Sequence, residues 1–140
     1  FLITQHKSWN LLKEAWREMV FPVIMGIQFC LAIVLLGSGN IVHNLGMVDF
    51  SGTHPTPAWA LDFDLFIKEL IDKKDHGALA NYDHMGKSAF LSVPTPEHYW
   101  PLLYTLAVQR PDDVLSYPVE AMDLASISMR CVQLTEPSAS

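Results

Sequence analysis

Charged residues are scarce in this chain, and basic residues are the scarcer kind. Of its 140 residues 17% are charged, and nine Lys and Arg against fifteen Asp and Glu give a formal net charge of −6. Proteins that follow nucleic-acid phosphates concentrate basic residues in one stripe, and no stretch of this sequence does so. The composition therefore argues against a nucleic-acid partner. Half of the residues are apolar and 11% are aromatic, which excludes global disorder and suits one domain or part of one.

Cysteine is nearly absent as well. Cys30 and Cys131 are the two cysteines, and they lack CxxC spacing. We expect both to behave as small hydrophobic residues in a reducing, cytoplasmic compartment, not as a disulfide framework or zinc knuckle. A single disulfide bond between the two cysteines is the alternative. The first residue is Phe1 and no secretory signal pattern precedes the apolar stretch, so we expect a fragment or the ordered part of something longer.

An uncharged apolar run covers residues 20–37, close to the minimum length of a membrane-spanning helix. Pro22 and Gly26 interrupt it, and its Val and Ile content favours two buried strands, at 22–29 and 31–36. Parallel strands need a crossover connection of about a dozen residues, and none lies between these two. Either the strands are not parallel or intervening chain is missing here. A single membrane span remains the alternative, and it predicts that the protein requires detergent.

Helical spacing recurs along the chain and predicts an α/β protein. A helix is expected over 8–19, a long one from Thr56-Pro57 to the lysines at 73–74, a short one at 78–85, and one beginning near 95–96. In the last of these, Pro101 either kinks the first turns or marks a delayed start. The long helix should bury an apolar face that consists of Trp59, Phe63, Phe66, Ile67 and Leu70.

Two further patterns concern polar positions. The carboxylates Asp62, Asp64, Glu69 and Asp72 are expected to form the solvated face of the long helix. Over 126–132 the apolar Ile127, Met129 and Cys131 alternate with serines and an arginine, which predicts a half-buried strand.

Six histidines are the main candidates for chemistry. His6, His43 and His98 stand where an element begins or ends, beside apolar residues, with Asn44 or Glu97 nearby to orient a ring nitrogen. A structural histidine bonded to the backbone is the competing interpretation, because no HExxH-type signature joins the three. The capping of a helix start is the simplest role for Glu97. The remaining three stand in polar, turn-like sequence and are expected on the surface: His54, His76 and His84.

Three segments together resemble one enzyme family. They are GSGNIVHNL at 37–45, PTPEHYWPLLY at 94–104 and SISMR at 126–130, and the opening HKSW at 6–9 adds to them. The chain thereby resembles the carboxyl-terminal half of the DODA-type (4,5-DOPA extradiol-like) ring-opening dioxygenases, which are class III extradiol enzymes of the LigB superfamily. The family's Asp and Gly around the first histidine are replaced by Gln5 and Lys7. The family's upstream half, with its His-Gly-Ser-Pro and Ser-Ala-His-Trp metal motifs, has no counterpart here.

The resemblance implies a fold and a set of roles. It implies part of a mixed central sheet flanked by helices, with 1–135 in a single catalytic domain and 136–140 as a polar tail. It implies metal binding by His43 and His98, with Fe(II) or Zn(II), and catalytic roles for His43 and His6. The implied substrates are a catechol and dioxygen. Neither a nucleic acid nor a membrane is an expected partner, and assembly into a homo-oligomer is left open. A truncated, inactive paralogue or interaction module of the same fold is the alternative.

Overall fold

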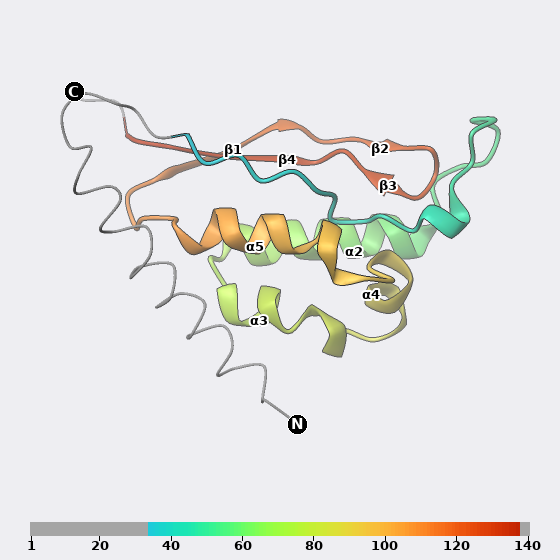
Figure 1. The fold of residues 1–140 in the computed structure, drawn as a ribbon, viewed down its shortest axis with the longest axis horizontal. Coiled ribbons are helices and arrows are strands. Elements are labelled where there is room, and N and C mark those ends of the chain that lie inside the picture. Colours follow the sequence, from blue (N-terminus) through green and yellow to red (C-terminus); the bar gives the residue numbers. More distant parts are fainter. Residues whose placement is uncertain (1–33, 138–140) are drawn as a thin grey trace. The chain divides into compact units, whose positions relative to one another are not determined.

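The computed structural model of the chain describes residues 34–137 (Figure 1). The chain divides into two compact units, Phe1–Leu36 and Gly37–Ser140, and only the second is described at length. Of the first unit, residues 34–36 have exposed side chains and no regular secondary structure, so the strand predicted at 31–36 is wrong for these three. No strand among the described residues pairs with them. The predicted helix at 8–19, the strand at 22–29 and nearly all of the candidate membrane span lie outside the described residues.

The second unit mixes helices with short strands, as expected for the α/β class (Figure 1). Its α-helices are α2 (Ala58–Asp72), α3 (His76–Ala80), α4 (Lys87–Ser92) and α5 (Trp100–Ala107), and its 3-10 helices are η1 (Leu45–Met47), η2 (Tyr82–His84) and η3 (Pro96–His98). Its strands are β1 (Val114–Val119), β2 (Met122–Asp123), β3 (Ile127–Ser128) and β4 (Cys131–Thr135). None of the helices within 34–137 has the length and apolar character needed to cross a bilayer.

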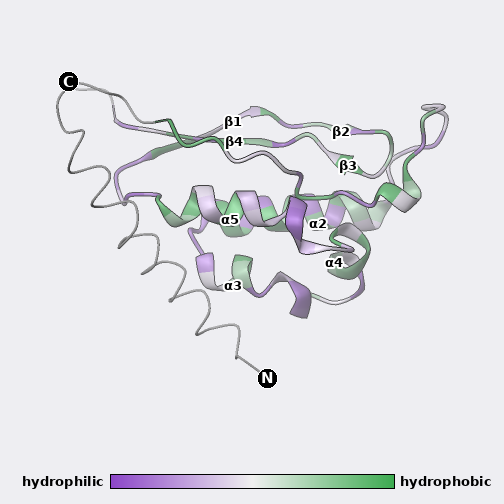
Figure 2. Cartoon of the chain, viewed as in Figure 1, coloured by the Kyte–Doolittle hydropathy of each residue, from purple (hydrophilic) through white to green (hydrophobic). Residues whose placement is uncertain are grey.

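Helix α2 forms where predicted, and Pro57 precedes its first turn. Hydrophobic and hydrophilic residues alternate around it, as in an amphipathic helix (Figure 2). The buried stripe contains Phe63, Ile67 and Leu70 as predicted, but Trp59 is only partly buried, Phe66 is 42% exposed and Asp64 is only 5% exposed. The stripe passes through Ala60, Asp64 and Ile67, which share one side of a 3.6-residue helix, whereas Phe66 lies beside it.

Two shorter helical regions also form near their predicted places. The helix predicted at 78–85 is replaced by α3 and η2, which meet at Asn81. The segment after Thr95 opens as η3, and α5 begins only at Trp100, with Pro101 in its first turn. Of the two roles considered for Pro101, the delayed start is therefore correct, because proline is tolerated where the backbone N–H has no partner within the helix.

The described strands form two separate two-stranded antiparallel sheets, β1 with β4 and β2 with β3. A mixed central sheet is not seen among residues 34–137. The strand predicted at 126–132 is split between β3 and β4, and its inward face is the opposite of the one expected. Ser126 and Ser128 are buried, whereas Met129 is 45% exposed and the free thiol of Cys131 is also exposed. Cys30 lies outside the described residues.

Candidate active site

The three segments that carry the family resemblance lie side by side in the structure (Figure 1). The backbone N–H of Asn40 donates to the carbonyl oxygen of His98 at 2.8 Å, and that of His43 donates to Ser92 at 2.9 Å. On the other side the Ser128 N–H donates to the carbonyl oxygen of Val42 at 2.9 Å, and His43 forms an isolated β-bridge with Ile127. Segment 40–43 is therefore held between the loop before α5 and strand β3.

Two glycines permit this close approach. A Cβ atom on Gly39 would lie 2.1 Å from the carbonyl oxygen of His98, and one on Gly37 would lie 2.6 Å from Oγ1 of Thr105. Ordinary carbon–oxygen contacts are far longer, so only a residue without a side chain fits at Gly39. The glycines of the GSG sequence thus allow the backbone of this segment to pack closely against the start of α5.

Replacing Gly39 with alanine is expected to lower the free energy of unfolding by about 1–3 kcal/mol, because the added carbon meets a backbone carbonyl that cannot move independently. Thermal unfolding measured by circular dichroism checks this. Gly46→Ala is the matched control, because its nearest neighbour, Oδ1 of Asn44, would lie at 3.4 Å. Equal destabilisation by both variants would contradict the close approach.

His43 and His98, predicted to share a site, do come together. Their ring centroids are 5.1 Å apart and the ring planes are inclined by 52°. His43 is buried, with 4% of its surface exposed, whereas His98 is exposed. His6, the third predicted site residue, lies outside the described residues.

Backbone carbonyls, and not the expected neighbours, orient the His43 ring. Nδ1 lies 3.0 Å from the carbonyl oxygen of Asn40 and Nε2 lies 2.7 Å from that of Thr95. The amide of Asn44 instead donates to the carbonyl oxygen of Leu91, and the Glu97 carboxylate accepts from the hydroxyl of Thr95 at 2.6 Å. That hydrogen bond lowers the pKa of Glu97, and so do its own backbone N–H and the neighbouring histidines.

The arrangement of His43 does not fit a metal ion as it stands. Coordination needs an unprotonated ring nitrogen, whereas a nitrogen that faces a carbonyl oxygen forms a hydrogen bond only when it carries a proton. Both nitrogens face carbonyl oxygens. Within residues 34–137 no group of three or more His, Cys, Asp and Glu side chains could hold an ion. Metal binding by His43 and His98 stays a prediction, and it requires one His43 ring nitrogen to move away from its carbonyl oxygen.

The other three histidines lie away from this pair. His54 and His84 are exposed, as expected, and Nδ1 of His54 lies 3.0 Å from the Asp49 carboxylate. His76 is partly buried, and its Nε2 lies 3.1 Å from Oε1 of Gln109. None of these contacts points to the site of His43.

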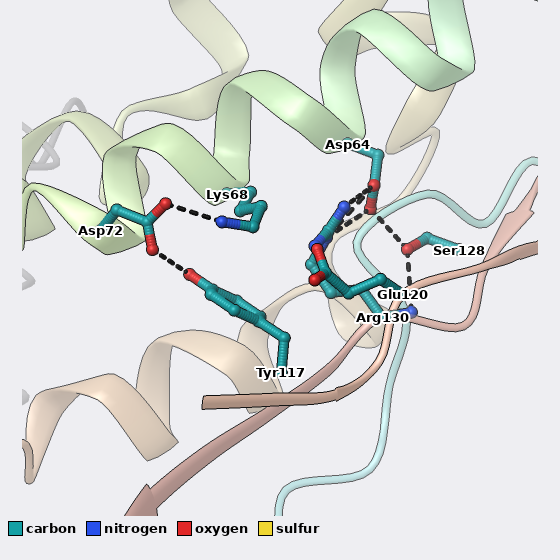
Figure 3. Close-up of polar contacts among 7 residues, drawn as sticks. All are labelled: Asp64, Lys68, Asp72, Tyr117, Glu120, Ser128 and Arg130. Carbon is teal, nitrogen blue, oxygen red and sulfur yellow. Dashed lines mark hydrogen bonds and ion pairs between the residues drawn. The ribbon is translucent and has the colours of Figure 1, made fainter. Parts of the chain in front are cut away.

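A buried ion pair is the feature that the sequence prediction missed (Figure 3). Nε and Nη2 of Arg130 lie 3.1 and 2.6 Å from Oδ2 of Asp64, and the two side chains are only 4% and 7% exposed. The Ser128 hydroxyl donates to Oδ1 of Asp64 at 2.6 Å and accepts from the backbone N–H of Arg130 at 3.2 Å. Nη1 of Arg130 also pairs with Glu120. The position of Asp64 between Ala60 and Ile67 on the apolar stripe was the available signal.

A second polar group lies next to this pair and joins α2 to β1 (Figure 3). Asp72 accepts from Nζ of Lys68 at 2.8 Å and from the Tyr117 hydroxyl at 2.7 Å, and Nζ of Lys68 lies 4.3 Å from the centre of the Tyr117 ring. Partial burial alone would raise the pKa of Asp72, but the hydrogen bonds from Lys68 and Tyr117 outweigh it and the pKa is lowered. Burial, and then the hydrogen bond to Asp72, raise the pKa of Tyr117.

Acid is expected to weaken the contact at Asp72. Because its pKa is lower in the folded chain than in the unfolded chain, the carboxylate contributes stability above about pH 4, and this is lost as pH falls through the folded pKa. The group is partly exposed, so the contribution is about 1 kcal/mol or less. Urea unfolding at pH 7 and pH 3 should show a smaller acid loss in Asp72→Asn than in the parent chain. An identical acid loss in both proteins would contradict it.

Comparisons with known proteins agree with the resemblance of the motifs. No family model matches the chain. The chain is 40% identical to the 4,5-DOPA dioxygenase extradiol of Escherichia coli K12, over 92% of its own length and 55% of that protein. It thus spans about half the length of the curated relative that it matches. The crystal structure of the uncharacterized protein JW3007 from the same organism matches with a TM-score of 0.60 and 38% identity, over 68% of this chain and 40% of that one.

This chain also differs from the Escherichia coli relative in length within the region that the two share. The match extends over 152 residues although the chain has 140, so the relative has residues inside the matched region that this chain lacks. Missing chain between residues 29 and 31 is one of the two explanations that the connection rule leaves for the strands predicted there; the other is that these strands are not parallel.

Proposed function

We propose that this chain, a homologue of the Escherichia coli 4,5-DOPA dioxygenase extradiol, forms the carboxyl-terminal part of an extradiol ring-cleaving dioxygenase that acts on a catechol. Residues 1–135 would belong to one catalytic domain, with 136–140 as a polar tail. The observation that carries the proposal is the meeting of His43 and His98, 55 positions apart in the sequence, at a ring distance of 5.1 Å. The 40% identity to an extradiol enzyme supports it.

The proposed ring cleavage requires a proton acceptor beside the substrate. Extradiol cleavage opens a catechol ring between a hydroxylated carbon and its unhydroxylated neighbour, and the second phenolic proton must be removed as oxygen attacks. An imidazole suits this role because it titrates near physiological pH. His98 is exposed and can meet a substrate directly, whereas the buried His43 can accept a proton only after one of its two carbonyl contacts opens. The proposal includes a cytoplasmic location and an Fe(II) or Zn(II) ion, with His43 and His98 as predicted ligands and further ligands beyond the residues described.

A second candidate function has its own support. Both nitrogens of His43 face backbone carbonyl oxygens, and residues 34–137 contain no cluster of three or more potential metal ligands. These observations suit an inactive paralogue or interaction module that keeps the fold without the reaction. The two candidates differ in one measurable property, which is whether the chain supports ring cleavage when the rest of the domain is supplied.

Complementation tests the proposal. The purified chain is mixed with the portion of the Escherichia coli relative that it does not match, loaded anaerobically with iron(II), and given 3,4-dihydroxyphenylalanine, a catechol, and then air. We expect the yellow semialdehyde from the mixture and little or none from the chain alone, because the described residues lack a full ligand set. The full-length relative is the positive control. A complex that forms, seen by size-exclusion chromatography, yet makes no product would favour the inactive module. Rapid cleavage by the chain alone would show that its ligand set is complete.

A further inference from the structure

The network in Figure 3 connects to the candidate site through one residue. Ser128 contacts Asp64 with its hydroxyl, and its backbone contacts the segment that carries His43: its N–H donates to Val42, and its carbonyl oxygen accepts from Nδ2 of Asn40 at 2.7 Å. Asn40 in turn supplies the carbonyl oxygen that faces Nδ1 of His43. Polar contacts that pass through Ser128 and Asn40 therefore link helix α2 to the imidazole.

The buried carboxylate of Asp64 has a fixed position. The carboxylate accepts from the Arg130 guanidinium at Oδ2 and from the Ser128 hydroxyl at Oδ1, so groups of the strand region fix the position of this α2 side chain. A buried charge that loses a partner is costly, which leaves the carboxylate one favourable position. The Ser128 hydroxyl bonded to it is consequently fixed, and the backbone of β3 with it.

We propose that Asp64 and Arg130 are positioning residues that hold the His43 imidazole in place through Ser128. This proposal rests on the proposed function for its meaning in catalysis, but the geometry that it concerns needs neither metal nor substrate. It explains why Ser128 of β3 faces inward although the next residue, Met129, lies at the surface. The inward hydroxyl is the only side-chain link that the described residues show between the Asp64 carboxylate and β3.

Nuclear magnetic resonance of the whole 140-residue chain tests it without an activity assay. In Ser128→Ala the ion pair between Asp64 and Arg130 remains, whereas the hydrogen bond from the residue 128 side chain to Asp64 is lost. We expect amide hydrogen exchange at His43 and Ser128 to accelerate about tenfold relative to amides of the β1–β4 ladder, the typical effect of losing one hydrogen bond. The ring nitrogens of His43 should also shift in resonance as their carbonyl contacts loosen. Asp64→Asn keeps an acceptor for Ser128 but removes the charge, and should give the same signature.

The control is Ile71→Val, a buried change on the same helix with no bond to the network. We expect it to lower the melting temperature while it leaves the His43 nitrogen resonances and the relative exchange rates as in the parent chain. If Asp64→Asn does not fold, Ser128→Ala and Arg130→Lys carry the test. Unchanged His43 resonances in Ser128→Ala, or the same changes in Ile71→Val, would overturn the proposal. Loss of ring cleavage in the complementation assay with these NMR results intact would count against the proposed function only.

Discussion

Arg130→Met is expected to lower the free energy of unfolding by about 3–5 kcal/mol, because it leaves the Asp64 carboxylate buried without its counter-charge. Asp64 is 7% exposed at its side chain, so water cannot replace the guanidinium unless the helix moves. The Ser128 hydroxyl alone is a poor substitute for a cation. Urea unfolding followed by circular dichroism at pH 7 measures the loss.

Two controls separate the buried charge from lost packing. The double variant Asp64→Leu with Arg130→Met replaces both partners by apolar groups, and we expect it to recover most of the stability. Lys73→Met breaks the exposed pair with Glu69 and should cost less than about 1 kcal/mol. If Arg130→Met costs no more than Lys73→Met, the pair does not stabilise the fold as described.

His43→Ala is expected to reduce ring cleavage in the complemented enzyme by about 100-fold or more, the usual effect of removing a positioned acid or base. The reduction should appear in kcat and not in KM alone, because the imidazole is proposed to act on the proton and not to capture substrate. His84→Ala is the matched control, since this histidine is exposed and belongs to η2, apart in sequence from the three segments that carry the family resemblance. An enzyme that keeps its full kcat without the His43 ring would contradict the assigned role.

The long helix could be predicted from the sequence, and the delayed start of α5 was one of the two options that Pro101 left, because both depend on local signals. A proline before an apolar period predicts where a helix begins, and neither case needs a distant partner. The meeting of His43 with His98 could not come from spacing, because the turn chemistry of neither segment specifies the other. It came from the resemblance to a known family, and in the structure the two ring centroids lie 5.1 Å apart.

The burial of Asp64 and the inward face of β3 were missed for one shared physical reason. Hydrophobic patterning assumes that polar residues face water, and that assumption fails where a carboxylate, a guanidinium and a hydroxyl satisfy one another. Asp64, Ser128 and Arg130 each look like surface residues when taken alone. Only the tertiary structure shows that their polar groups pair with one another inside the fold.

The contact between Asn40 and Ser128 joins residues separated by 88 positions, and that between Asn44 and Ser126 joins residues separated by 82. Contacts that close such long loops form late, because the chain must lose much of its freedom before they form. During synthesis on the ribosome, helix α2 can therefore form before segment 40–43 makes its contacts with β3. Until residues 126–128 have emerged from the exit tunnel, the neighbourhood of His43 lacks one of its two sides.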